Sequence, residues 1–135
     1  MLLAPGWCLV ACGGAPPPPD VPATFPATAI AQVTSDSGAL HIELRSAPEP
    51  LVRGQNVGQI TVTDGSGQPV DGLSLAVMPW MPLDGHGTSA PAISTTDPGV
   101  FIANPLYLFM AGQWQLFMTF DGEIHDTAMA VVDIP

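Results

Sequence analysis

The sequence predicts an all-β protein, an immunoglobulin-like antiparallel β-sandwich of about seven strands. From about residue 38 onward, apolar and polar residues alternate with a period of two between turn signals, as in half-buried antiparallel strands. The chain of 135 residues contains 14 Gly and 16 Pro, which are too many for long helices. The apolar segments are short and almost regularly spaced, and seven is the number expected of such a sandwich. A β-barrel is the alternative architecture.

Each strand is predicted from its own alternation. Leu40, Ile42 and Leu44 share one face of the first strand, and the Asp64–Gly67 turn closes the second. The third strand points Val77 inward and Met78 outward. The predicted strands centre on residues 40–45, 60–63, 73–78, 90–95, 100–103, 114–120 and 128–134.

Composition limits the classes of partner. The chain contains twelve acidic residues, two arginines and no lysine, which gives a formal net charge of −10. A chain this acidic repels phosphate groups, so nucleic acid and anionic lipid are poor partners. No nucleophile elbow, phosphate-binding glycine loop or zinc-protease motif occurs, and His41-Ile42-Glu43 lacks the cysteines of a deaminase. We therefore expect a protein that is not an enzyme.

The N-terminal third divides into two segments ahead of the domain. Leu9-Val10-Ala11-Cys12 resembles a bacterial lipobox, which makes residues 1–12 a lipoprotein signal segment and Cys12 the lipidated residue. Only eleven residues precede Cys12 and none is basic, so the true start of the protein could lie upstream. The alternative is that residues 1–12 are only an apolar tail and not a signal segment. Residues 13–37 are rich in proline and are expected to form an extended tether, followed by the sandwich domain at 38–135. We expect an extracytoplasmic protein of the cell envelope, lipid-anchored at the periplasmic face of the outer membrane.

Several segments resemble the YtkA-like domain family over about residues 38 to 134. They are residues 50–58, 60–64 and 67–70, the run Met78-Pro79-Trp80-Met81-Pro82 with Gly85-His86-Gly87, and residues 109–114. The resemblance implies a small extracytoplasmic immunoglobulin-like module. It also implies a place near copper handling and respiratory-oxidase maturation, which makes an oxidase-assembly or efflux protein of the envelope the expected partner.

One group of residues suits a soft metal ion. Met78, Met81 and His86 lie within nine residues, on what we expect to be a bent loop after the third strand. Thioethers and imidazole together favour Cu(I) over zinc, magnesium or calcium. Met110 lies in a predicted loop at the same end of the sandwich and is the expected fourth ligand, with Trp80 as an aromatic cover.

Other interpretations of these residues remain open. Loop methionines often plug the end of a β-sandwich core, and a histidine between glycines is often only a turn residue. His125 is expected at the opposite end of the domain and outside the site. The sequence thus predicts an envelope lipoprotein that binds or passes Cu(I). The alternatives are a non-metal interaction domain, with Trp80 or Phe109 as anchors, and a structural spacer.

Overall fold

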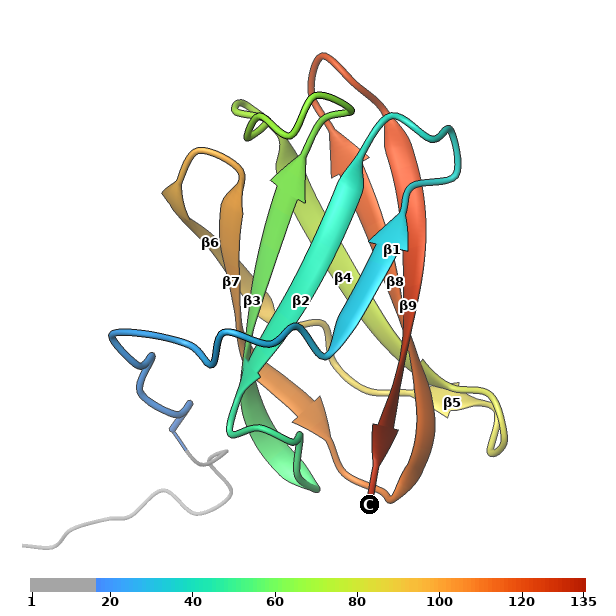
Figure 1. Ribbon diagram of the computed structural model, residues 1–135. Coiled ribbons are helices and arrows are strands. Elements are labelled where there is room, and N and C mark those ends of the chain that lie inside the picture. The colour runs from blue at the N-terminus through green and yellow to red at the C-terminus, as the bar shows by residue number, and fades with distance from the viewer. Residues whose placement is uncertain (1–16) are drawn as a thin grey trace, which may run out of the picture.

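Two antiparallel β-sheets packed face to face make up the domain (Figure 1). The computed structural model describes residues 17–135, and nine strands occur in this range. The strands are β1 (Ala31–Thr34), β2 (His41–Ala47), β3 (Gly54–Thr63), β4 (Ser74–Met81), β5 (His86–Gly87), β6 (Ala92–Asp97), β7 (Val100–Leu108), β8 (Gly112–Asp121) and β9 (Asp126–Ile134).

The strand order is that of an immunoglobulin domain. One sheet has the order β1-β2-β3-β7-β6 and the other β5-β4-β8-β9. Strands β2, β3, β7 and β6 take the positions A, B, E and D, while β4, β8 and β9 take C, F and G. Strand β5 lies where variable-type domains have C′. The predicted immunoglobulin-like sandwich is therefore confirmed.

Alternation along the strands builds the core. In β4, β8 and β9 every second side chain is buried between the sheets, and the residues between them face outward. Trp114 and Phe120 of β8 are fully buried, and they share one core cluster with Leu40, Ile42 and Val62. Burying these apolar side chains is the main favourable contribution to folding.

All seven predicted strands occur, and two further strands join them. The additional strands are β1, within the predicted tether, and β5, which is only two residues long. Two predicted loops are wrong, because β4 continues through Pro79 to Met81 and β7 continues through Pro105 to Leu108. Both prolines suggested strand ends in the sequence, since proline lacks the N–H group that a central strand needs. The connection between β7 and β8 is consequently only residues 109–111.

The predicted tether is partly folded onto the domain. The amide of Asn104 donates a hydrogen bond of 2.8 Å to the carbonyl of Pro19, and the Arg45 guanidinium donates to the carbonyl of Ala27. The backbone N–H of Ile30 then donates to the carbonyl of Leu44, and β1 begins at the next residue. The tether predicted for residues 13–37 and the domain start at 38 are therefore wrong in this part of the chain. The predicted signal segment at 1–12, with Cys12, lies outside the described residues.

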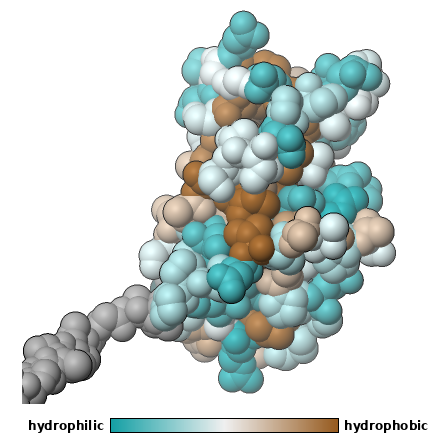
Figure 2. All heavy atoms as spheres, turned by 90° about the vertical axis from the view of Figure 1, so that its left-hand side faces the viewer, coloured by the Kyte–Doolittle hydropathy of each residue, from teal (hydrophilic) through white to brown (hydrophobic). Residues whose placement is uncertain are grey.

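The surface of the sandwich is not uniformly polar. Seen from the β6 side, a strip of apolar residues runs along the molecule between hydrophilic margins (Figure 2). Ile93 of β6 is partly buried against the core on this side. No helix long and apolar enough to span a membrane occurs within residues 17–135.

Candidate functional site: one end of the sandwich

Strand β4 separates the two methionines predicted to act together. Met78 is 51% exposed, whereas Met81 is 2% exposed and belongs to the core. Three residues along a β-strand place two side chains on opposite faces of the sheet. The expectation that Met78 and Met81 lie on one bent loop is wrong, and Met78 does not join Met81 in a site within one molecule.

Met81 and His86 do come together. They are directly opposite each other in the β4–β5 pair, and the turn between them is closed by a 2.9 Å hydrogen bond from the N–H of Gly85 to the carbonyl of Met81. Residues directly opposite in an antiparallel pair have β-carbons roughly 4.5–5.5 Å apart and project from the same face. The short strand β5 therefore carries His86 beside the end of the core where Met81 is buried.

Met110 lies in the connection between β7 and β8, at this same end of the domain. It is partly buried against the core, and its carbonyl accepts a 3.0 Å hydrogen bond from the indole N–H of Trp114. Two residues further on, a β-carbon on Gly112 would lie only 2.8 Å from Cε of Met81. The prediction that the segments around Met81 and Met110 share an end of the sandwich is confirmed. His125 lies at the other end, in the turn between β8 and β9, where its Nδ1 is 2.8 Å from Oδ1 of Asp121 (Figure 1).

The aromatic residue beside the histidine differs from the predicted one. Trp80 points outward from β4, with 36% exposure, and packs beside Gly87. Phe109 instead stacks on the ring of His86, with centroids 5.5 Å apart, and contacts Trp114 edge-on at 5.5 Å. Phe109 is partly buried in this stack, so it is not the exposed anchor considered from the sequence. The contact of Phe109 with His86 could not be predicted from the sequence, because it depends on how β4 pairs with β5 and with β8.

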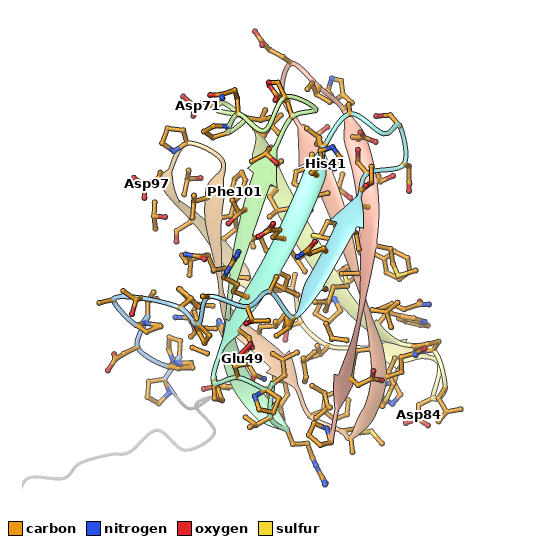
Figure 3. The ribbon with its side chains drawn as sticks, in the orientation of Figure 1. His41, Glu49, Asp71, Asp84, Asp97 and Phe101 are labelled. Carbon is orange, nitrogen blue, oxygen red and sulfur yellow. The ribbon has the colours of Figure 1, made fainter. Side chains whose placement is uncertain are left out.

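One acidic group lies near the histidine. Asp84 lies in the turn between β4 and β5 (Figure 3). Its Oδ2 is 4.0 Å from Nε2 of His86. The side chains of His86 and Asp84 are 45% and 36% exposed, so water reaches both groups. Within residues 17–135 no three His, Cys, Asp or Glu side chains are grouped so that they could hold a metal ion. The candidate donor set is therefore Met81, His86 and Met110, which is two thioethers and one imidazole, a combination suited to Cu(I).

A second feature lies on the outward side of the sheet β5-β4-β8-β9. Met78 pairs with Phe117 of β8, which pairs with Met129 of β9. In the next row Trp80 pairs with Gln115, which pairs with Val131. We call these five exposed apolar residues the outer apolar face: Met78, Trp80, Phe117, Met129 and Val131. The sequence indicates this face, because three of the outward positions of β8 and β9 are apolar: Phe117, Met129 and Val131.

A shallow depression occurs elsewhere, against β1 and β2. It has a volume of about 250 Å³, and polar side chains including Gln32, Thr34 and His41 line it. These strands belong to the other sheet, so the depression is separate from the Met81–His86 end.

The chain is similar to one protein family over most of the sandwich. A family model described as YtkA-like matches residues 34–119, which run from the end of β1 into β8. No curated protein and no solved structure matches the chain.

Proposed function

The chain belongs to the YtkA-like family, and from this premise we propose that it is an accessory domain of the cell envelope that binds or passes Cu(I). We place the ion at the end of the sandwich that carries Met81, His86 and Met110. The protein is lipid-anchored through Cys12, and its partner is a copper-handling or oxidase-assembly protein of the envelope.

The placement of Met81 opposite His86 carries the proposal. Register fixes this pair to one face of the sheet, and the neighbouring connection supplies Met110. Thioether sulfur and imidazole nitrogen are neutral donors that match a soft monovalent ion, so the bound site has a charge of about +1. The net charge of −10 on the chain then attracts the ion to the protein.

The burial of the donors suggests how the ion is held. The imidazole of His86 is half-exposed, whereas Met81 is buried and Met110 partly buried. The imidazole is the donor that solvent and a partner protein can reach. The methionines provide an apolar surrounding that disfavours water and hard ions. Phe109, stacked on the imidazole, restricts its ring orientation.

Competition for Cu(I) with a chromogenic chelator, under anaerobic reducing conditions, tests the proposal. Met81→Leu and Met110→Leu each preserve size and apolarity but remove a sulfur donor, so each is expected to weaken binding about tenfold or more. Met118→Leu is the matched control for Met81, because Met118 is equally buried on β8. Met78→Leu is the control for the outer face. The proposal would be overturned if a triple Met81→Leu, Met110→Leu, His86→Asn variant melted like the wild type and competed for Cu(I) as well as the wild type does.

A non-metal interaction role is the second candidate, and a separate observation favours it. The outer apolar face exposes five large apolar side chains in two adjacent rows, and contiguous exposed apolar surfaces of this kind mark interaction sites. Because this face and the Met81–His86 pair lie on opposite sides of β4, the two roles are compatible.

A further inference from the structure

The outer apolar face is continuous across three strands. Met78, Phe117 and Met129 form one cross-strand row, and Trp80 and Val131 flank Gln115 in the next. Their exposures range from 36% for Trp80 to 51% for Met78. Side chains directly opposite on one face of a sheet touch, so the five residues form one surface and not scattered exposed positions. Contiguous exposed apolar surfaces of this kind mark interaction sites.

The charges around this face are all of one sign. The strands β4, β5, β8 and β9 and the turns that join β4 to β5 and β8 to β9 contain no Lys or Arg, because Arg45 lies in β2 and Arg53 in the connection between β2 and β3. Asp133 lies on the outward face of β9 in the row next to Val131, and Asp84 lies in the turn that follows β4. Asp121 and Glu123 lie farther away, at the β8–β9 turn, where Asp121 contacts His125. The centre is thus apolar, and the margin next to Val131 and Trp80 is acidic.

From this arrangement we propose that the outer apolar face docks a partner protein that presents apolar side chains flanked by lysine or arginine. The apolar side chains of the partner cover Phe117 and the two methionines, and its cations face the acidic margin. Complementary charge steers such an encounter and fixes its orientation. Two exposed methionines, Met78 and Met129 on either side of Phe117, provide an unbranched, adaptable surface that accepts partners of varied shape.

Other occupants fit the surface less well. Two copies of a chain with a net charge of −10 repel each other, and an anionic lipid surface repels it for the same reason. Five half-exposed side chains also offer less than the roughly 800 Å² that each partner of a stable complex buries. A transient contact with a cationic protein matches both the charge and the area. This proposal rests on the interaction role and is independent of the copper site, which uses the opposite face of β4.

Two short synthetic peptides with the same leucine and valine content, one carrying lysines and the other glutamates, serve as probes. The methyl groups of the methionines, followed by NMR with methyl-labelled protein, report where each peptide binds. We expect the lysine peptide to shift Met78 and Met129 saturably at low salt, less so at high salt, and to leave the buried Met81 and Met118 unmoved. The glutamate peptide is expected to shift none of them.

Matched substitutions sharpen the test. Val131→Thr combined with Phe117→Thr is expected to weaken the lysine peptide about tenfold or more, since apolar anchors dominate interface energies. Val52→Thr makes the same valine change at an equally exposed position in the other half of the molecule, and is expected to change nothing.

Equal binding of both peptides, or no effect of the double variant, overturns the proposal. Concentration-dependent shifts of Met78 and Met129 without peptide would indicate self-association and would also overturn the proposal. Binding of phosphatidylglycerol vesicles that shifts the same methyl groups would overturn it as well. Copper binding is measured separately and is expected to be unchanged in the double variant.

Discussion

The hydroxyl of Ser37 donates a 2.5 Å hydrogen bond to the carboxylate of Asp126, which lies 89 residues further along the chain. The backbone N–H of Ser37 donates to the same carboxylate at 3.2 Å. The hydroxyl of Thr127 donates to the carboxylate of Asp36, and the backbone N–H of Asp36 donates to the carbonyl of Thr127. These contacts fasten the β1–β2 turn of one sheet to the start of β9 in the other. They join the two sheets at the end opposite the candidate copper site.

Stability is expected to fall in acid because of Asp126. The hydrogen bonds from Ser37, and then Ser35, lower the pKa of this carboxyl from 3.8 to about 2. A pKa depressed in the folded state stabilises the fold above the unfolded value, and this stabilisation is lost as pH falls from about 4 towards 2. Asp126→Asn is therefore expected to lower the thermal midpoint at neutral pH and to flatten its dependence on pH in that window. Asp133→Asn removes the same charge from an exposed position of β9 and serves as control. Identical acid profiles for wild type and Asp126→Asn would show that this contact contributes nothing.

The two faces of β8 are expected to respond differently to the loss of a phenylalanine. Phe120 is fully buried, so Phe120→Ala should reduce the free energy of unfolding by about 3–5 kcal/mol. Phe117 is 43% exposed, so Phe117→Thr should change the free energy of unfolding by less than about 1 kcal/mol. Urea denaturation measures both. A large loss for Phe117→Thr would mean that the outer apolar face supports the fold and is not kept for a partner.

The position of β5 is expected to control the copper site. A β-carbon at Gly87 would lie 2.6 Å from the backbone carbonyl oxygen of Pro79, so Gly87→Ala must push β5 away from β4. This displaces His86 from Met81, and Cu(I) affinity should fall about tenfold or more in chelator competition. Because β5 is a two-residue edge strand, the thermal midpoint should change little.

Gly65→Ala is the control for this variant. A β-carbon at Gly65 has no neighbour within 4 Å, and the residue lies in the turn after β3, at the far end of the sandwich. It is expected to bind Cu(I) like the wild type. Unchanged Cu(I) affinity in Gly87→Ala, with β5 shown by NMR to be displaced, would argue against a role for His86.

The sequence predicted the sandwich well, because its main strands are half-buried and therefore alternate. Strand β5 could not be predicted, since two residues carry no period, and β1 was hidden in a stretch rich in proline and alanine. The candidate site was predicted in part. Alternation already pointed Met78 outward, but Pro79 and Pro82 suggested a loop that would bring Met78 back to Met81. Proline is accepted at position 79 because β4 has only the short β5 on one side.

Long-range contacts account for the rest of what the sequence did not reveal. The stack of Phe109 on His86 and the bond from Ser37 to Asp126 join residues far apart in the chain. No local pattern encodes such pairs, since they follow from strand order and register. The outer apolar face, by contrast, follows directly from the alternation of β8 and β9 once β4 is known to continue beyond Met78.

Addition of Cu(I) under anaerobic conditions to methyl-labelled protein shows which methionines bind the ion, because each methionine gives its own methyl signal. We expect the methyl signals of Met81 and Met110 to shift and to saturate at one equivalent. Those of Met118 in the core and of Met78 and Met129 on the outer apolar face should stay in place. Shifts confined to Met78 and Met129, or no shift of any methionine, would contradict a copper site formed by Met81, His86 and Met110.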